Sequence, residues 1–372
     1  MKITHFELLH VRPRWLFLKV HTDVGIIGLG EPTLEGRART VAEAVREYER
    51  MLIGQDPRRI EHLWQRMYRQ TFYRGGPVLC SAISGIEQAM WDILGKSLGV
   101  PVYQLLGGAV RDRIRIYGWT RGGQTGDYIE NFIHHLEARQ FTAYKFAPID
   151  ACRMIESPAA MQRAVDRVAE ARRIVGDEID LAVDLHGRCT PALSRRLARK
   201  LEPFDLLFIE EPVLPGDTAA LAALSAACST PIATGERLFT RWQFQELIER
   251  QAAAVLQPDL SHVGGIFETR KIAAAAEARN IAIAPHCPLG PIALAASLQV
   301  DATTPNFLIQ EHVTLGAEYL KQPFIVNDGY IDLPTGPGLG IELDDEKVKA
   351  GQFDGDWDTP TFHLDDGSIA EW

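Results

Sequence analysis

The sequence predicts an α/β protein in which a (β/α) barrel follows a small α+β domain. From about residue 113, eight short β-rich runs alternate with longer amphipathic stretches, a pattern typical of βα units around a parallel sheet. The first hundred or so residues differ, because alternation of apolar and polar residues comes first and helical periodicity follows. Eight βα units most naturally close into a barrel, so the whole is predicted to be TIM-type.

The N-terminal α+β domain is predicted over residues 1–112. Its first three alternating runs favour an antiparallel meander, with Gly25, Gly28 and Gly30 near the turns. These runs are 2–10, 13–22 and 24–31. Three helical periodicities follow, at 37–52, 59–70 and the apolar 80–98. Gly99 and Pro101 end the last of them.

The barrel is predicted over residues 113–321. Its strand-like runs are 113–119, 143–147, 180–186, 206–212, 231–236, 254–260, 281–286 and 307–311. The helices expected between them include 158–175, 217–228, 240–252 and 266–279. Residues 322–372 leave this rhythm, with the turn signals NDG and PTGPGLG and a Trp-containing tail, and are expected to return to the first domain.

Composition excludes several classes of protein. The net charge of −10 comes without a basic stripe, which argues against a nucleic-acid surface. No apolar stretch approaches the roughly 18–20 residues of a membrane span, and the N-terminus lacks a signal-peptide core. The five cysteines are scattered and without CxxC spacing, as expected of reduced thiols in a cytoplasmic protein.

Three carboxylates end consecutive strand-like runs. Asp184, Glu210 and Glu236 are each separated by 26 residues, about one βα repeat. Consecutive strands therefore deliver one carboxylate apiece to the C-terminal rim, where barrels of this kind carry their active sites. Three acids there would repel one another unless a cation compensated them. Oxygen ligands without clustered Cys or His select Mg²⁺ over zinc or copper.

A structural alternative exists for each of these acids, because Asp and Glu also follow strands to cap helices and form turns. Capping does not require carboxylates on three consecutive strands, however. The run FIEEP also offers two glutamates, of which Glu210 is preferred and Glu211 is the fallback.

Two histidines end strand-like runs beside carboxylates. His186 stands two residues after Asp184, so alternation along a strand would aim both side chains the same way. His286 ends run seven and Asp259 ends run six, which makes them a plausible general-base dyad with His186 as a second acid or base. Glu311, at the end of run eight, could hydrogen-bond a developing enediolate if protonated. The alternative for each is a structural role.

Two further residues are predicted to reach the same mouth. Lys145, on run two, either stabilises a substrate carboxylate or pairs with a metal-bound acid. His262 lies just past the rim and is assigned to substrate binding, whereas Arg237 is expected to be a structural counter-ion. The GxG of GIIGLGE lacks the third glycine of a dinucleotide motif, and neither GxxxxGK[ST] nor GxSxG occurs.

In this order, these residues resemble the enolase superfamily, and specifically its mandelate racemase-like group. The resemblance runs from MKIT through VGIIGLGEP and FYRGGPVLCSAISGIEQAMWDILGK to the terminal SIAEW. Within the group the chain resembles the D-galactonate dehydratases, through PRWLFLKV, EGRARTV, LIGQDP, FIEEPV, GERLF, LQPDLSHVGGI, APHCPLGPIALAA and PGLGIEL.

The resemblance implies a modified (β/α)₇β barrel, an α+β capping domain completed by the C-terminal segment, and one Mg²⁺ per subunit. Asp184, Glu210 and Glu236 would be the metal ligands. His286, oriented by Asp259, would abstract the C2 proton of an aldonate, His186 would protonate the departing C3 hydroxyl, and Glu311 would take the electrophilic position. The product would be a 2-keto-3-deoxy acid, and the family tends toward homo-oligomers.

The chain also departs from its relatives. Racemases of this group carry Lys-x-Lys on the second barrel strand, whereas this chain reads Lys145-Phe146-Ala147, which favours β-elimination over racemisation. The loops 121–128 and 147–157 do not match the galactonate dehydratases, so the identity of the sugar acid stays open. A racemase or epimerase and a non-catalytic sugar-acid-binding protein are the alternative functions.

Overall fold

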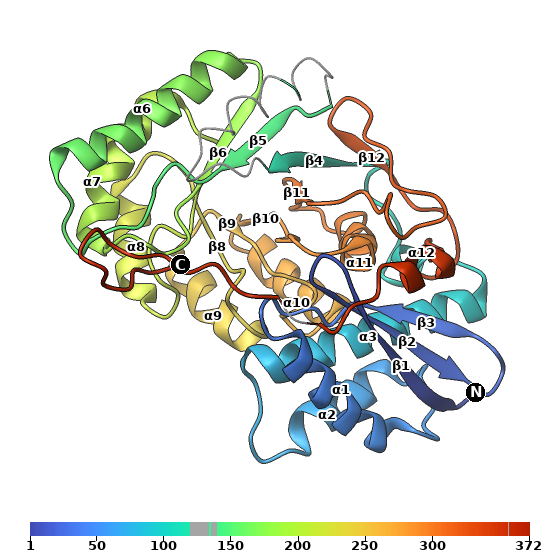
Figure 1. Ribbon diagram of the computed structural model, residues 1–372. Coiled ribbons are helices and arrows are strands. Elements are labelled where there is room, and N and C mark those ends of the chain that lie inside the picture. Colours follow the sequence, from blue (N-terminus) through green and yellow to red (C-terminus); the bar gives the residue numbers. More distant parts are fainter. Residues whose placement is uncertain (120–133, 135–139, 356) are drawn as a thin grey trace.

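A small antiparallel sheet and a group of helices form the N-terminal domain (Figure 1). The computed structural model describes residues 1–119, 134, 140–355 and 357–372. The sheet has the order β1-β2-β3, and its strands are β1 (Ile3–Val11), β2 (Trp15–Thr22) and β3 (Ile27–Gly30). The helices are α1 (Ala38–Leu52), α2 (Ile60–Arg69), α3 (Gly76–Leu98) and the short α4 (Val102–Leu105). The predicted meander and the three helices are confirmed.

Two of the glycines that were expected near turns lie inside β3 instead. Gly28 and Gly30 face α3, and a Cβ on Gly30 would stand 1.9 Å from the carbonyl oxygen of Gly85. Glycine is needed here because the sheet backbone and the helix backbone approach too closely for any side chain. The contact fixes α3 against the sheet, with the opposite side of the helix toward the barrel.

Eight parallel strands form the barrel. They are β4 (Arg113–Trp119), β5 (Ala143–Phe146), β6 (Asp180–Asp184), β7 (Ile209–Glu210), β8 (Ile232–Thr234), β9 (Val255–Leu256), β10 (Ala282–Ile283) and β11 (Gln310–Glu311). Neighbouring strands are hydrogen-bonded in the order β10-β9-β8-β7-β6-β5-β4-β11. A parallel bridge between Ile283 and Phe307 joins the two ends of the sheet. The sheet is therefore closed, as predicted.

A helix follows each strand from β5 to β10. These helices are α6 (Pro158–Val175), α7 (Pro191–Leu201, continued by the 3₁₀ turn η1, Glu202–Phe204), α8 (Thr218–Ala227), α9 (Arg241–Arg250), α10 (Ile266–Glu277) and α11 (Pro291–Asp301). No barrel helix follows β11 in the described chain, which fits the predicted (β/α)₇β architecture. Inside the barrel, the rings of Tyr117 and Phe208 pack among alanines and other apolar side chains. These side chains fill the lumen below the rim.

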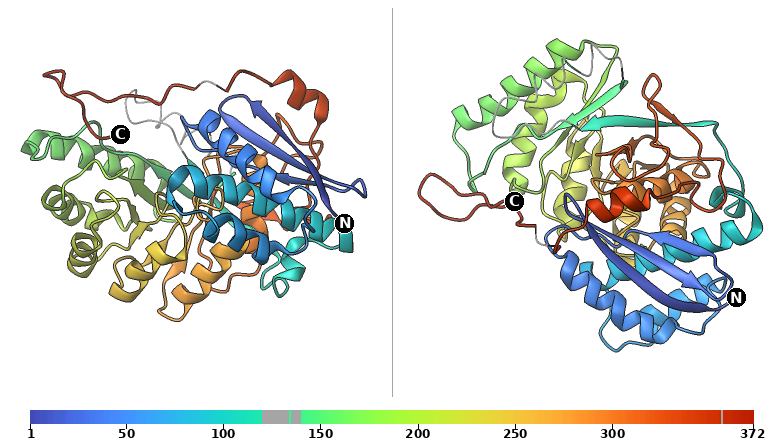
Figure 2. Two further views of the ribbon diagram at one scale, coloured as in Figure 1. Left: turned by 90° about the horizontal axis from the view of Figure 1, so that it is seen from below. Right: turned by 45° about the vertical axis from the view of Figure 1, so that its right-hand side comes forward.

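The C-terminal segment contacts both domains. Strand β12 (Tyr330–Asp332) pairs antiparallel with β4, and α12 (Asp345–Ala350) lies against the N-terminal sheet, where Lys19 and Asp345 form a 2.7 Å ion pair. Beyond α12, an extended tail crosses from the N-terminal domain to the rim of the barrel (Figure 2). The boundaries 1–112, 113–321 and 322–372 stay predictions. None of the helices in the described chain is long and apolar enough to cross a membrane.

Candidate active site

Three carboxylates lie together at the C-terminal rim of the barrel. Asp184 and Glu210 are the last residues of β6 and β7 and are register partners, and Glu236 follows β8 by two residues. One oxygen from each lies within 4.8 Å of the others. Within the described residues this is the one group of three or more Asp, Glu, His or Cys side chains with metal-binding geometry.

The electrostatics of this group fit a bound cation. Burial and the neighbouring charge of Asp184 raise the pKa of Glu210 well above its ordinary value. Oε2 of Glu210 accepts from Gln257 Nε2 at 2.6 Å, whereas the buried Oε1 has no hydrogen-bond partner within the described chain. A buried acceptor left unpaired is costly. A cation coordinated by the three acids would satisfy this oxygen and relieve their repulsion.

Lys145 lies beneath these acids, fully buried on β5. Its Nζ is 2.7 Å from Glu210 Oε2, 3.0 Å from Glu311 Oε1 and 3.6 Å from Asp184 Oδ2. It does not line the cavity described below. Of the two roles weighed from the sequence, this geometry supports pairing with acids of the metal group over contact with a substrate carboxylate.

The second glutamate of FIEEP points away from the group. The strand ends at Glu210, and Glu211 has φ +37°, which turns its side chain out of the alternation expected for a strand running to 212. Its carboxylate is held by two nitrogens of Arg237, with Nε at 3.0 Å. Arg237 is thus a counter-ion, chiefly to Glu211 and more distantly to Glu236, at 3.9 Å.

His286 stands beside Glu236 in a network of acids. Its Nδ1 is 2.8 Å from Asp259 Oδ2 and its Nε2 is 3.0 Å from Glu236 Oε2. Burial alone would lower the pKa of His286, but the charges of Glu236 and Glu311 and the hydrogen bonds to Asp259 and Glu236 raise it well above 6.5. Asp259 is itself fixed by the backbone N–H of Ser261, at 2.7 Å.

Glu311, the last residue of β11, closes this side of the site. Its Oε2 accepts from the backbone N–H of Cys287 at 2.9 Å and lies 3.7 Å from His286 Nε2. Its other oxygen contacts Lys145. The side chain is therefore held within reach of the histidine and of the carboxylate group.

His186 reaches the site by a route that strand alternation did not predict. β6 ends at Asp184, not at 186, and His186 adopts φ +48° in the turn that follows. Left-handed backbone is rare for a non-glycine residue and is concentrated at functional sites. The turn still brings His186 Nε2 to 3.0 Å from Asp184 Oδ2, while its backbone N–H donates to Asp184 Oδ1 at 2.9 Å.

His262 lies on the β9–α10 loop next to the dyad. Its Nδ1 is 2.9 Å from Ser81 Oγ on α3, and its Nε2 is 3.6 Å from Asp259 Oδ2. The hydroxyl of Ser81 also donates to the carbonyl of Pro77 at 2.7 Å. His262 is thus anchored to the N-terminal domain while one side of its ring borders the cavity.

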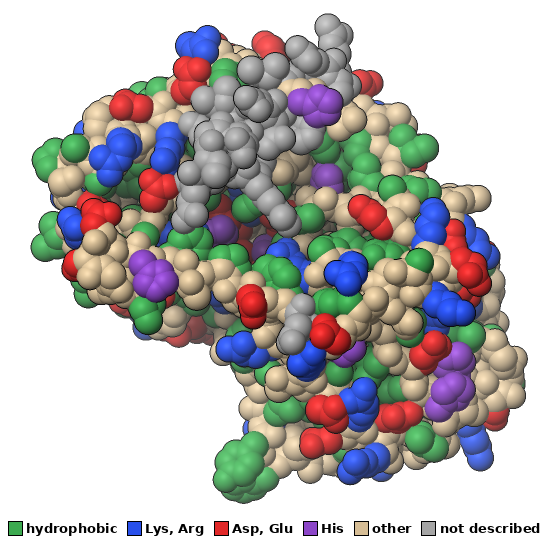
Figure 3. Space-filling view, in the orientation of Figure 1, with side chains coloured by type: hydrophobic (Ala, Val, Ile, Leu, Met, Phe, Trp, Pro, Cys, Tyr) green, Lys and Arg blue, Asp and Glu red, His purple; other side chains and the backbone are tan. Residues whose placement is uncertain are grey.

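A cavity of about 590 Å³ opens over the carboxylates, between the barrel, the N-terminal domain and the tail. In the space-filling view, histidine and acidic side chains are visible inside this hollow (Figure 3). Its lining includes the predicted Asp184, Glu236, Glu311, His186, His262 and His286. It also includes residues that the sequence analysis missed, among them Arg14, Trp119, Arg188, Trp357, Phe362 and Trp372. None of them belongs to a recognised motif: Trp119 ends β4, and the others come from loops and the tail.

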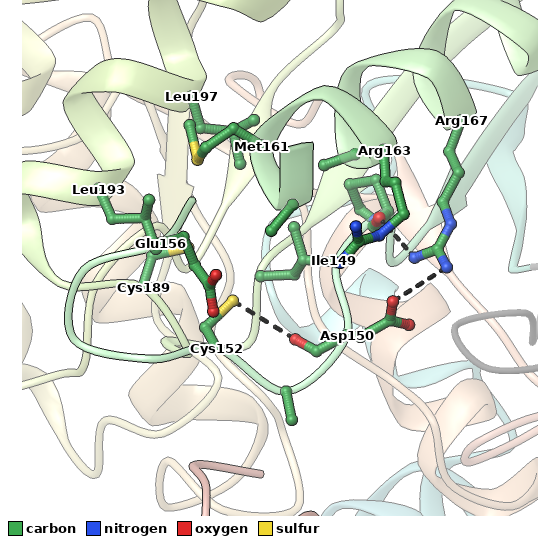
Figure 4. A pocket seen from close by; sticks show the side chains of 14 residues that line it. Ile149, Asp150, Cys152, Glu156, Met161, Arg163, Arg167, Cys189, Leu193 and Leu197 are labelled. Atoms are coloured by element: carbon green, nitrogen blue, oxygen red, sulfur yellow. Dashed lines mark hydrogen bonds and ion pairs between the residues drawn. The ribbon is translucent and has the colours of Figure 1, made fainter. Parts of the chain in front are cut away.

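The loop 147–157 borders a second, smaller pocket. Of this loop, Ala147 lines the large cavity, whereas residues from Pro148 onward line a pocket of about 60 Å³ with α6 and α7. Arg167 of α6 lies 3.0 Å from Asp150. Figure 4 shows this pair, and Cys152 and Cys189 line the same pocket. The other divergent loop, 121–128, lies outside the described residues.

Two family models together match most of the chain. The model described as "Mandelate racemase / muconate lactonizing enzyme, N-terminal domain" matches residues 10–107, and "Enolase C-terminal domain-like" matches residues 128–348. With the closed barrel and the three rim carboxylates, these matches define the class of protein. The chain belongs to the enolase superfamily, in its mandelate racemase-like group, as the sequence predicted.

More particular relatives match over the full length. The D-galactonate dehydratases of Variovorax paradoxus and Ralstonia nicotianae are 48% and 49% identical, covering 100% of both chains in each case. Among solved structures, an enolase from Agrobacterium radiobacter, a proposed galactarate dehydratase with bound sodium and L-malate, has a TM-score of 0.93 at 30% identity over 100% of both chains. The predicted dehydratase class of enzyme is confirmed by these relatives.

Proposed function

We propose that this protein dehydrates an aldonate, D-galactonate in the first place, to a 2-keto-3-deoxy acid with one Mg²⁺ per subunit. The observation that carries the proposal is the group of three rim carboxylates, two of which contact a histidine. His286 contacts Glu236, and His186 contacts Asp184. The full-length D-galactonate dehydratase relatives support the substrate.

Asp184, Glu210 and Glu236 would hold the metal. Their all-oxygen donor set suits a hard cation, and the unpaired Oε1 of Glu210 leaves one donor ready to coordinate it. Mg²⁺ would stabilise the second negative charge that develops on the substrate carboxylate when C2 loses its proton. The sodium and L-malate bound to the Agrobacterium radiobacter enolase support a fold that takes a 2-hydroxy acid together with a cation.

The chain's own residues would move the protons. A cation held by the three rim acids would offset the charge of Glu236, which is the largest cause that raises the pKa of His286, and so would favour the neutral ring. In that ring Asp259 accepts from Nδ1–H, so the lone pair lies on Nε2, which would take the C2 proton. The electrons of the C2–H bond form the enediolate, and their return expels the C3 hydroxyl as water once His186 has protonated it. The resulting enol ketonises. Glu311 in its protonated form would donate a hydrogen bond to the charged oxygen, and His262 would contact a substrate hydroxyl at the cavity wall.

A racemase would need a second base on the opposite face of C2. The position that carries the second lysine in racemases is Ala147 here, and its methyl group borders the cavity. An alanine cannot exchange protons, which supports elimination. A cytoplasmic location and a homo-oligomeric state belong to the same proposal.

The test is a panel of hexonates and pentonates assayed for keto-acid formation with and without Mg²⁺. We expect D-galactonate to give a semicarbazide-reactive product, EDTA to stop the reaction and added Mg²⁺ to restore it. Full activity in chelator would remove the metal from the proposal. A product that is a stereoisomer of the substrate would replace dehydration with epimerisation.

A further inference from the structure

The tail beyond α12 forms one wall of the cavity. Trp357, Pro360, Phe362 and Trp372 all line it. A tight hairpin shapes the last part of this tail. Gly367, with φ +83°, donates its N–H to the carbonyl of Leu364 at 2.9 Å, and Ala370 donates to the carbonyl of Phe362 at 2.9 Å. The hairpin returns the chain so that the rings of Phe362 and Trp372 meet edge to face, 6.2 Å apart.

The ring of Trp372 packs against the ring of His186. The centroids of the Trp372 and His186 rings are 5.2 Å apart and tilted by 53°. Phe362 lies under the guanidinium of Arg188 at 4.5 Å, and that guanidinium is 3.5 Å from His186 Nδ1. Arg188 is in turn fixed by the carbonyl of Ile149, at 2.9 Å. The tail therefore contacts His186 directly through one aromatic ring and indirectly through the other.

The ring of His186 has few other contacts within the described residues. It lies on a turn after β6 and contacts one rim acid, Asp184, at 3.0 Å, while the ring of Trp119 at the end of β4 is more distant, with centroids 6.5 Å apart. A ring with one fixed edge can rotate into open space, and a displacement of about 1 Å can cost a catalytic group up to about 10²-fold in rate. A ring packed against its side restricts that rotation.

We propose that Trp372 is a positioning residue that holds the imidazole of His186 where it can protonate the leaving hydroxyl. Phe362 and Arg188 complete the support. This inference rests on the proposed function, in which His186 serves elimination and His286 serves deprotonation. Loss of the ring of Trp372 should therefore impair the second step and spare the first.

The experiment compares Trp372→Ala with Trp372→Phe and with Ile369→Ala, a control in the same hairpin whose side chain is 83% exposed. Each variant is assayed with D-galactonate and Mg²⁺ for keto-acid formation and, in D₂O, for deuterium at C2 of recovered substrate. We expect Trp372→Ala to lower kcat for keto-acid formation by about 10- to 100-fold while C2 exchange continues. Trp372→Phe should recover most of the loss, and Ile369→Ala should match wild type.

A second measurement is independent of turnover. In protein labelled with ¹³C at histidine Cε1, the resonance absent from His186→Asn should shift in Trp372→Ala, because the ring current of the indole is removed, and the resonance absent from His286→Asn should stay in place. Wild-type turnover by Trp372→Ala, equal loss of exchange and elimination, or an unmoved His186 resonance would each overturn the positioning role. Failure of the wild-type enzyme to dehydrate any aldonate would instead overturn the proposed function.

Discussion

The two histidines of the site are held by different parts of the molecule. His286 lies among buried acids, and the loops around it are tied to the N-terminal domain by buried hydrogen bonds. Glu31 accepts from the N–H groups of Gly290 and Ala293 at 2.7 and 3.0 Å. Glu87 accepts from Ile266 at 2.7 Å and from Phe267 at 2.9 Å.

His186 has no such frame. Its neighbours in the described chain are a turn, the buried Arg188, Trp119 at the end of β4 and the tail that crosses the surface. The part of the site around His286, the proposed base, is therefore built into the domain interface, so that the position of His286 and the stability of the fold depend on the same contacts. The part around His186, the proposed acid, is held mainly by loops and the tail, which can change without disturbing the core. The difference implies that removal of the C2 proton depends on the buried scaffold, whereas expulsion of the C3 hydroxyl from the intermediate depends on the loops and the tail.

The largest effect is expected at the buried histidine. Replacing His286 with Asn removes the proposed base but keeps a side chain of similar polarity, so both C2 exchange and dehydration should fall by at least about 10³-fold. Rates of deuterium incorporation and keto-acid release measure the two steps, and the thermal midpoint reports on the fold. His62→Asn, at an exposed position on α2, is the matched control. Unchanged kcat would eliminate His286 as the base.

A smaller and selective loss is expected at the other histidine. His186→Asn should lower the rate of dehydration by about 10²-fold, the low end of the contribution of a general acid, while C2 exchange persists. The two histidines would then differ in the step they serve as well as in the contacts that hold them. Loss of both steps, or of neither, would contradict the division of labour.

The barrel and its rim acids were predictable because their physical constraints are periodic. Strand, helix and repeat length together bring Asp184, Glu210 and Glu236 to one edge, whatever the loops do. The dyad of Asp259 and His286 follows from the same spacing.

The remaining features were not predictable because they depend on single backbone angles or on long-range packing. The positive φ of His186 and of Glu211 breaks the alternation that the sequence analysis assumed, and only in Glu211 does it turn the side chain away from the site. Trp372 lies 186 residues after His186 in the sequence, and no local pattern links the two. Glu87 lies in an apolar helix where burial, not a motif, determines its role.

The smallest effect, on stability alone, should come from Glu87. Burial is the main cause that raises its pKa to about 8, against hydrogen bonds from Phe267, Ile266 and Trp91 that lower it. A raised pKa means that the folded state binds the proton more tightly than the unfolded state. Its stabilising contribution is therefore present below about pH 4.5 and is lost as the pH rises to about 8. Glu87→Gln cannot ionise and should escape this loss.

The measurement is the thermal midpoint of Glu87→Gln minus that of wild type from pH 5 to pH 8.5, with Glu47→Gln, at an exposed position on α1, as the control. The difference should rise with pH by a few degrees, since about 1 kcal/mol moves the midpoint of a large domain by about 2–4 °C. A difference that stays flat or falls would mean that the N–H groups of α10 keep Glu87 ionised at every pH tested. In that case Glu87 would be an anion bound at the N-terminus of α10, and its contribution to stability would persist across this pH range instead of fading.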